Sequence, residues 1–356
     1  MTRFAFIVHP IHAKDAARKY PWMKWLPDGM IEKIMLMKEP GLVSEITGIE
    51  SITGAKTQGW FIGLPMTPHM MTESVPIDVV VQKIAQCGDI AADLGADIIG
   101  LGAFTSVVGD GGVTVAAHTK IKAVTTGNSY TVATAIEATL DACQKLDVDM
   151  PNSTLAVVGA TGSIGKTCAK VLSRTFGRTV LVGRVQERTQ LVADDIRGAV
   201  ATTDVNAIRE ADAIVTVSSA GKELIHPEHL KPGAVVCDVA RPRDVSVAVS
   251  KERHDVLVIE GGVVAVPGNV NFNFNFGFPP KTAYACMSET MILALENKVE
   301  NFTLGKDVSV EQVDEIEALA RKHGFKLAGY RSFERAVNEE QIEHARRARA
   351  RILAGV

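Results

Sequence analysis

The pattern of apolar and polar positions predicts alternating strands and helices along the first 150 residues. Residues 2–8 form a short apolar run typical of a β-strand. Between 76 and 95, apolar residues recur at helical spacing in a segment that begins with proline and ends with glycine, so we expect a helix. A buried strand is expected at 96–104, and a helix is expected to follow the polar segment 125–131. These elements predict an N-terminal α/β domain over residues 1–150, which we expect to bind the substrate.

The clearest pattern lies between residues 151 and 280. Apolar runs of strand length alternate there with amphipathic helical segments, which predicts a parallel sheet covered by helices on both faces. The expected fold is therefore a doubly wound Rossmann domain. Its strands are expected at 154–160, 179–184, 211–219, 233–240 and 256–262, and its first two helices at 163–176 and 186–198.

Three other segments have less regular patterns. Residues 9–40 contain prolines and tryptophans and are expected to be irregular, while 59–71 hold two prolines and are expected to form a loop. Residues 281–356 are expected to be mainly helical. The predicted fold class is α/β, a Rossmann domain flanked by the N-terminal α/β domain and by C-terminal helices.

Composition and charge narrow the class of protein. Hydrophobic residues make up 46% and charged residues 22% of the 356, which is typical of a globular protein in water. The formal charge of −3 provides no general attraction to nucleic acid or to anionic lipid. The first apolar run is interrupted by His9 and Pro10, unlike a signal peptide, and no apolar run has the length of a transmembrane helix. We expect a cytoplasmic protein, and no oligomeric state follows from the sequence.

The cysteines are widely spaced and form no CxxC pair. Their odd number favours thiols in a reducing compartment over a disulfide framework. Cysteines and histidines do not share the spacing of a zinc site, so no metal is expected. The five are Cys87, Cys143, Cys168, Cys237 and Cys286.

The segment VVGATGSIGK places three glycines between a predicted strand and a predicted helix. Gly159 permits the tight turn, Gly162 lets the backbone approach a pyrophosphate, and Gly165 allows the helix to pack closely on the strand. The start of the helix also presents unpaired N–H groups to phosphates. We therefore predict a dinucleotide site that also includes the neighbouring loop residues Thr161, Ser163 and Ile164.

The end of the second Rossmann strand indicates which dinucleotide binds. NAD sites usually place an acidic residue there for the ribose 2′-hydroxyl, whereas this chain has Gly183 and Arg184, followed by Arg188. Arginine suits the 2′-phosphate of NADP(H), because the guanidinium can form charge-assisted contacts with it. The sequence thus favours NADPH/NADP⁺ as cofactor.

Further candidate residues lie where predicted strands end, because open α/β sheets bind ligands at the carboxyl ends of their strands. Ser218 and Ser219 end the 211–219 strand, and Gly261 and Gly262 end the last strand, where the nicotinamide is expected. In the polar segment 125–131, three residues suit either a contact with substrate or nicotinamide or a helix cap. These three are Thr126, Gly127 and Asn128.

Taken together, several segments resemble the cyanobacterial long-chain acyl-[acyl-carrier-protein] reductases. The resemblance extends over about residues 60–325 in the same order and is specific as a combination of motifs. It rests on GLGAFTSVV (100–108), TTGNSYT (125–131), VVGATGSIG (157–165), GGVV (261–264), YACMSETMILALE (284–296) and ARKHGF (320–325). Residues 1–60 and 326–356 depart from the family, which leaves acyl length and carrier open.

The resemblance implies a reaction and a nucleophile. It implies that NADPH reduces a fatty acyl thioester, carried by acyl carrier protein or coenzyme A, to an aldehyde through an acyl-cysteine. The family motif Ala-Cys-x-x-Glu corresponds here to Ala285, Cys286 and Glu289. Glu289 lies on the same helical face as Cys286 and is a candidate for proton transfer. A carboxylate alone would disfavour a thiolate nearby, so a cation such as Lys281 or a helix start is also required.

Two other functions remain open on the sequence. The segment DVARPRDV (238–245) is reminiscent of shikimate dehydrogenases and glutamyl-tRNA reductases, so the chain could be an NADP-dependent dehydrogenase of a small molecule. It could also bind NADP without catalysing a reaction. Neither alternative needs Cys286, so an acyl adduct on this residue would distinguish them from the reductase.

Overall fold

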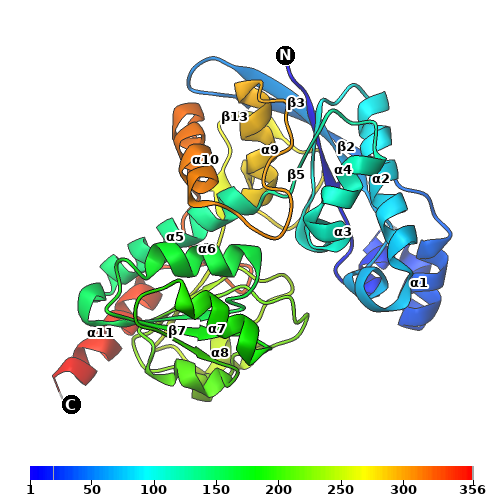
Figure 1. The fold of residues 1–356 in the computed structure, drawn as a ribbon. Helices are drawn as coiled ribbons and strands as arrows, with labels where there is room; N and C mark the ends of the chain where they lie inside the picture. Colours follow the sequence, from blue (N-terminus) through cyan, green and yellow to red (C-terminus); the bar gives the residue numbers. More distant parts are fainter. Residues whose placement is uncertain (19, 355–356) are drawn as a thin grey trace. The chain divides into compact units, whose positions relative to one another are not determined.

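The computed structural model describes residues 1–18 and 20–354. It contains two compact units, and neither is a single stretch of sequence (Figure 1). Unit 1 comprises residues 1–127, 265–306 and 316–326, and unit 2 comprises residues 128–264, 307–315 and the chain from 327 onward. Each of the three domains expected from the sequence is one continuous stretch of residues. In the structure, each of the two units combines three separate stretches of the chain.

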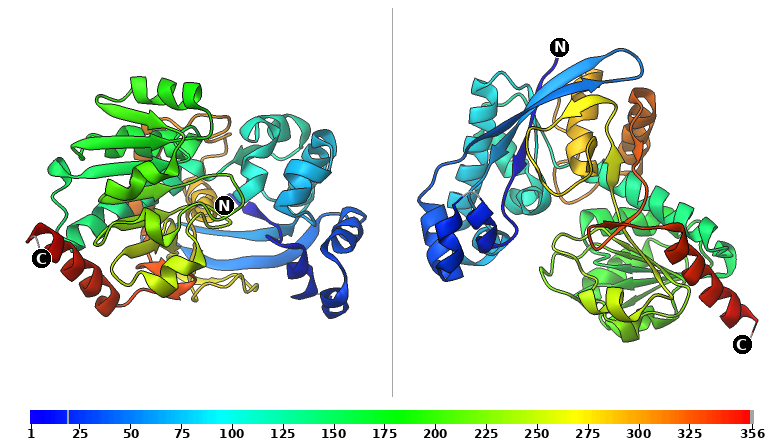
Figure 2. Two further views of the ribbon diagram at one scale, coloured as in Figure 1. Left: turned by 90° about the horizontal axis from the view of Figure 1, so that it is seen from below. Right: turned by 180° about the vertical axis from the view of Figure 1, so that it is seen from behind.

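Unit 1 is built on a six-stranded sheet with the order β13-β2-β3-β1-β4-β5. Strand β1 is parallel to β3 and β4, and β4 is parallel to β5. Strands β2 and β3 form a long antiparallel hairpin, and β13 adds antiparallel to β2 (Figure 2). The strands are β1 (Phe4–Val8), β2 (Gly41–Glu50), β3 (Lys56–Gly63), β4 (Ile98–Gly100), β5 (Ala123–Thr125) and β13 (Gly268–Asn271).

Helices cover both faces of this sheet. Helix α2 (Ile77–Asp93) shares a hydrophobic core with Ala5 and Ile7 of β1. Helix α9 (Ala285–Glu296) packs on β1, β3 and β4 from the opposite side of β1 (Figure 1). A Cβ added to Gly100 would lie 2.1 Å from Thr290 Oγ1 of α9. Glycine at this position therefore permits the close packing of α9 on the sheet.

Unit 2 has the topology of a dinucleotide-binding fold. Its sheet has the order β11-β10-β9-β6-β7-β8, and all neighbouring strands are parallel. Numbered within the unit, this is the order 3-2-1-4-5-6 of the doubly wound fold, which confirms the predicted fold class. The strands are β6 (Thr154–Val158), β7 (Arg178–Val182), β8 (Ala199–Thr202), β9 (Ala213–Thr216), β10 (Val235–Asp238) and β11 (Leu257–Glu260).

Helices pack against this second sheet as expected for a parallel arrangement. Helix α5 contacts β9, β10 and α6, and α6 contacts β6 and β9. Helix α11 contacts β11, and its Arg349 forms an ion pair with Asp212 at 2.8 Å. The helices of unit 2 are α5 (Asn128–Lys145), α6 (Ser163–Leu172), α7 (Gln186–Asp194), α8 (Val247–Glu252) and α11 (Glu339–Leu353).

Three sequence predictions of local structure were wrong or incomplete. The stretch expected to be irregular contains helix α1 (Asp28–Leu36). Residues 59–63, expected in a loop, belong to β3, because this continuous apolar run is a buried central strand and the prolines follow it. The strand expected at 96–104 is limited to β4, since a 3₁₀ turn (Ala103–Ser106) follows it.

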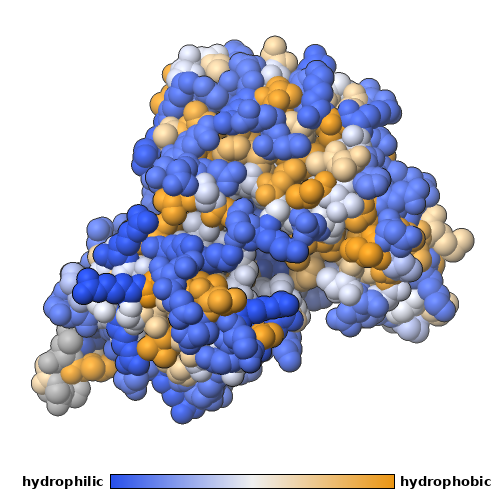
Figure 3. Space-filling model, viewed as in Figure 1, coloured by the Kyte–Doolittle hydropathy of each residue, from blue (hydrophilic) through white to orange (hydrophobic). Residues whose placement is uncertain are grey.

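Helix α10 (Val310–His323) belongs to both units, because residues up to 315 are part of unit 2 and residues from 316 are part of unit 1. The remaining α-helices and strands are short. On the face seen in Figure 3, apolar residues are dispersed among polar ones, as on ordinary protein surfaces. Of the helices that the structure describes, none is both long and apolar enough to cross a membrane. The short elements are α3 (Val108–Gly111), α4 (Val113–His118), β12 (Val263–Ala265), β14 (Thr282–Tyr284), β15 (Lys326–Leu327), β16 (Arg331–Ser332) and β17 (Arg335–Ala336).

Candidate active site

The glycine-rich loop connects β6 to α6, as predicted. Gly159 has φ of +83°, and a Cβ at this residue would lie 2.8 Å from the carbonyl oxygen of Val217. A Cβ at Gly165 would lie 2.3 Å from the carbonyl oxygen of Gly159, which explains why α6 can begin so close to the strand. Gly162 is exposed and is the N-cap residue of α6. The loop and the helix N-terminus therefore fit the pyrophosphate of a dinucleotide.

The remaining predicted residues of this loop lie around the start of α6. Thr161 is exposed, while Ser163 and Ile164 are half-buried. The Nδ2 group of Asn128, the first residue of α5, donates a hydrogen bond to Ser163 Oγ at 3.4 Å. Asn128, expected at the substrate, thus lies beside the dinucleotide loop in unit 2.

The two arginines expected at the 2′-phosphate follow the second strand of unit 2. Arg184 lies two residues after the end of β7, and Arg188 lies in α7. Both side chains are exposed. A Cβ at Gly183 would lie 2.2 Å from Thr189 Oγ1, so this glycine lets the chain turn tightly from β7 toward α7. The position suits a contact with the adenosine ribose of NADP(H).

Ser218 is part of a buried polar network after β9. Its hydroxyl donates to Asp244 Oδ1 at 2.5 Å, and its backbone N–H donates to Asp244 Oδ2 at 2.8 Å. Thr216 also donates to the same carboxylate, which is fully buried. The Ser218 side chain therefore holds the loop in place. A contact between it and the cofactor remains a prediction.

The segment DVARPRDV folds around a second buried carboxyl group, that of Asp238 at the end of β10. Its Oδ2 accepts the backbone N–H of Val245 at 3.0 Å, and its Oδ1 accepts that of Ala240 at 3.1 Å. Burial raises the pKa of Asp238 to about 7, although the charge of Arg241 opposes this shift. Arg241 also forms an ion pair with Glu260 at 3.4 Å. These contacts anchor the loop at the carboxyl edge of the sheet.

Gly261 and Gly262 directly follow β11 and are both buried. A Cβ at Gly261 would lie 2.7 Å from Val239 Cγ2 and 3.0 Å from Cys237 Sγ. A larger residue would clash there, so the glycine is required for packing. Its predicted position at the carboxyl end of the last strand agrees with the structure, and contact with the nicotinamide remains a prediction.

Cys286 differs from the other cysteines in its exposure. It is half-buried, whereas the remaining four of the five cysteines, all of which the structure describes, are buried. Burial raises the pKa of the Cys143 and Cys237 thiols to about 12, and it also raises the pKa of Cys87 and Cys168. These four thiols are thereby kept protonated and unreactive.

Cys286 is the second residue of α9, whose N-cap residue is Tyr284. The N-terminus of a helix stabilises negative charge and therefore favours a thiolate. Gly127 lies directly against the cysteine, because a Cβ at Gly127 would lie 2.4 Å from both Cα and Cβ of Cys286. The positive φ of Gly127, +76°, also favours glycine. The predicted residue Gly127 and the candidate nucleophile are therefore neighbours in unit 1.

Glu289 lies one turn after Cys286 and is fully buried. Its Oε1 accepts hydrogen bonds from the hydroxyls of Thr125 and Thr303, the latter at 3.0 Å. Thr125 Oγ1 in turn accepts the backbone N–H of Gly127 at 3.3 Å. The predicted residue Thr126 donates to the carbonyl oxygen of Thr303 at 2.7 Å. Glu289 thus anchors the loop that lies against Cys286.

Lys281 is the cation that the sequence suggests for stabilising a thiolate at Cys286. Its ammonium donates a hydrogen bond to Asn269 Oδ1 at 2.9 Å, and the residue is exposed. The start of α9 favours a negative charge at Cys286, and a contact between Lys281 and the thiol remains a prediction.

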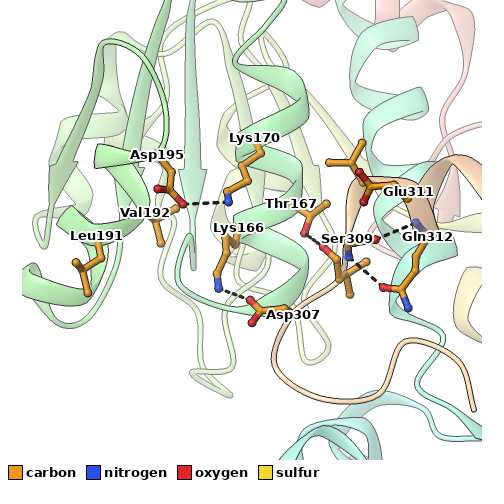
Figure 4. A pocket seen from close by; sticks show the side chains of 12 residues that line it. Lys166, Thr167, Lys170, Leu191, Val192, Asp195, Asp307, Ser309, Glu311 and Gln312 are labelled. Atoms are coloured by element: carbon orange, nitrogen blue, oxygen red, sulfur yellow. Dashed lines mark hydrogen bonds and ion pairs between the residues drawn. The ribbon is translucent and has the colours of Figure 1, made fainter.

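A surface hollow of about 620 Å³ lies elsewhere, between α6, α7 and residues 307–312 of unit 2 (Figure 4). Its two lysines are paired, Lys166 with Asp307, and Lys170 with Asp195 at 3.0 Å. None of the predicted site residues lines it. Across the described residues, no group of three or more histidine, cysteine or acidic side chains could hold a metal ion.

Comparisons with known proteins show which proteins the chain resembles and over which residues. Residues 141–260 match the family model of shikimate / quinate 5-dehydrogenase. The chain is 28% identical over 329 residues to a long-chain acyl-[acyl-carrier-protein] reductase of Synechococcus elongatus, covering 88% of this chain and 94% of the reductase. It is 30% identical over 310 residues to the aminotransferase PigE of a Serratia strain, covering 84% of this chain but only 36% of that protein.

Among solved structures, the L-tryptophan dehydrogenase of Nostoc punctiforme is similar with a TM-score of 0.43. The identity is 12%, and the match covers 90% of this chain and 80% of the dehydrogenase. The sequence similarity to the acyl-[acyl-carrier-protein] reductase extends over both units. The shikimate / quinate 5-dehydrogenase family model, by contrast, matches only residues within unit 2.

Sequence reasoning did not identify several residues that shape the site. Asp244 lies in the DVARPRDV segment, where the charged residues were a usable signal. Thr125 begins the TTGNSYT segment but was not singled out. Thr303 carried no local signal, because only the fold brings it to Glu289.

Proposed function

We propose that this chain is an NADPH-dependent oxidoreductase that reduces a fatty acyl thioester to an aldehyde through an acyl-enzyme on Cys286. The observation that carries the proposal is the setting of Cys286, a half-buried cysteine at the N-terminus of α9 with Gly127 against it. The similarity to a long-chain acyl-[acyl-carrier-protein] reductase over 88% of the chain supports it. The expected donor is acyl carrier protein or coenzyme A.

The proposed chemistry assigns defined roles to this chain's residues. The Cys286 thiolate attacks the carbonyl carbon of the thioester and forms a C–S bond to it, the C–S bond to the carrier breaks, and the carrier leaves as a thiolate that takes a proton from water. Bound NADPH supplies the hydride that reduces the resulting enzyme thioester. The C–S bond to Cys286 then breaks, the aldehyde leaves, and the thiolate is restored. The N-terminus of α9 favours the thiolate at both ends of this cycle.

Glu289 acts in this proposal as a residue that positions the thiol. Its carboxyl group binds Thr125, Thr125 receives the N–H of Gly127, and Gly127 lies against Cys286. The predicted proton transfer by Glu289 remains part of the proposal, because the carboxyl lies one turn from the thiol on the same helix.

The test is acylation in the absence of NADPH. After incubation with hexadecanoyl-CoA, intact-mass spectrometry is expected to show one hexadecanoyl group per chain, mapped to Cys286 by peptide sequencing. Addition of NADPH is expected to remove the adduct and release hexadecanal. The absence of an adduct, or its location on another residue, would contradict the covalent mechanism.

The same unit-2 sequence matches a shikimate / quinate dehydrogenase family model, so reduction of a small molecule is the second candidate. In that case quinate or shikimate would support NADP⁺ reduction, and the acylation test would be negative. The match ends at residue 260 and does not include the unit-1 segment that carries Cys286.

The proposed preference for NADPH gives a separate prediction. Replacing Arg184 by alanine is expected to weaken NADPH binding by about tenfold or more, because a charge-assisted contact with the 2′-phosphate is lost. NADH binding is expected to change little. Isothermal titration calorimetry with both cofactors measures this. Arg197→Ala, another exposed arginine of unit 2, is the matched control, and equal weakening of NADPH and NADH binding in Arg184→Ala would contradict the assignment.

A further inference from the structure

An unusual group of aromatic rings lies next to Cys286 in the chain. The protein contains 12 phenylalanines in 356 residues, yet four of them occupy every second position in FNFNFGF. Together with Phe61 of β3 and Tyr284 they form a continuous series of ring contacts, which we name the aromatic ladder. Its members are Phe61, Phe272, Phe274, Phe276, Phe278 and Tyr284.

Each ring of the ladder contacts at least one other ring of the ladder. Phe61 lies 6.0 Å from Phe272 and 5.7 Å from Phe276, measured between ring centroids. Phe276 lies 5.5 Å from Phe278, and Phe278 lies 4.4 Å from Tyr284. Such edge-to-face and stacked contacts are favourable between aromatic rings. The ladder therefore extends without a break from the sheet of unit 1 to Tyr284.

Asparagines before and between the phenylalanines form hydrogen bonds with the backbone of this part of unit 1. Asn271 Oδ1 accepts the N–H of Asn273 at 2.9 Å, and Asn275 Oδ1 accepts the N–H of Gly277 at 2.9 Å. Asn273 Nδ2 donates to the carbonyl oxygen of Glu45 on β2 at 3.1 Å. These local turns leave the polar side chains exposed, while the intervening rings contact one another.

The ladder is only partly buried. Phe272 is 8% exposed, whereas Phe274 is 42% exposed, and Phe276 and Phe278 are half-buried. A cluster that served only to stabilise the fold would gain by burying all its rings. Phe274, Phe276 and Phe278 instead leave apolar surface uncovered, of the kind that marks a ligand site.

One end of the ladder, Tyr284, lies two residues before the proposed acyl acceptor in the chain. Tyr284 is the N-cap residue of α9, and Cys286 follows it by two positions. We propose that the ladder binds the alkyl chain of the acyl group, with the carbonyl end at Cys286 and the chain running from Tyr284 along Phe278 and Phe276 toward the exposed Phe274. This inference rests on the proposed function and assigns these rings of the chain to the alkyl part of its substrate.

The test compares acyl chains of different length. The rate constant for acylation is expected to rise from octanoyl-CoA to hexadecanoyl-CoA, with an upper limit of about fourfold per added methylene.

In Phe274→Ala and Phe276→Ala, the rate with hexadecanoyl-CoA is expected to fall about tenfold, while the rate with octanoyl-CoA stays within about twofold. Phe274 is exposed enough for its alanine variant to fold normally, which a thermal melt checks. The control is Trp25→Ala, because Trp25 is a surface aromatic in unit 1 that is 85% exposed.

A second measurement separates this inference from the proposed function. Binding of hexadecanoic acid, measured by calorimetry, does not require acylation and is expected to weaken about tenfold in Phe276→Ala. If the wild-type protein forms no acyl adduct but the ladder variants bind hexadecanoic acid more weakly than wild type, the proposed reaction is wrong. The assignment of the ladder to the alkyl chain is then still supported. If the ladder variants keep the chain-length profile and fatty acid affinity of wild type, the ladder assignment is overturned.

Discussion

Replacing Cys286 by alanine is expected to reduce turnover of acyl thioesters by about a thousandfold or more, because the variant has no atom that can accept the acyl group. Binding of NADPH is expected to be unchanged, since the dinucleotide loop belongs to unit 2. Steady-state oxidation of NADPH with hexadecanoyl-CoA measures the first effect, and calorimetry measures the second.

The matched control for this variant is Cys168→Ala. Cys168 is buried in α6, and burial raises the pKa of its thiol. Removing it deletes a thiol without touching the proposed nucleophile and is expected to lower stability modestly while activity persists. If Cys286→Ala retained the wild-type rate, the acyl-cysteine mechanism would be wrong, whatever the substrate.

Gly127→Ala is expected to lower kcat/KM by about a hundredfold while leaving the protein folded. The new methyl group would lie 2.4 Å from Cα and Cβ of Cys286, so either the loop or the start of α9 must shift. A displacement of the nucleophile by about 1 Å is enough for an effect of this size. The rate of alkylation of Cys286 by iodoacetamide, followed by mass spectrometry, measures the change at the thiol directly.

Gly54→Ala controls for backbone strain. Gly54 has φ of +83°, close to the +76° of Gly127, but no atom lies within 4 Å of its added Cβ. Both variants carry the strain of a positive φ, about 1 kcal/mol, and only Gly127→Ala adds the clash with Cys286. Equal activities of the two variants would show that Gly127 does not position the thiol.

Much of unit 2 could be predicted because its signals are local. Strands β6, β7, β9, β10 and β11 are short apolar runs between helical segments, and buried parallel strands require this composition. The glycines at 159 and 165 also have local causes, since the chain must turn and the helix must start close to the strand. The edge strand β8 was missed because its residues are less buried.

Unit 1 was harder to predict because its sheet is assembled from distant segments. Strand β13 pairs with β2 more than 200 residues earlier in the chain, and neither has a strong apolar pattern. Its helix α9 lies far in sequence from the strands that it covers. Local propensity carries no information about such pairings.

By itself, the sequence predicted the Rossmann unit and the glycine-rich loop between its first strand and helix, and through resemblance it led to the proposal of Cys286 as nucleophile. Only the tertiary structure brought Gly127 against Cys286 and Thr125 and Thr303 to Glu289. It also joined Phe61 to the rings of 272–278. The physical reason is the range of the interactions. A turn or a helix start depends on neighbouring residues, whereas a buried carboxyl group needs hydroxyl partners that only the packing of distant segments can supply.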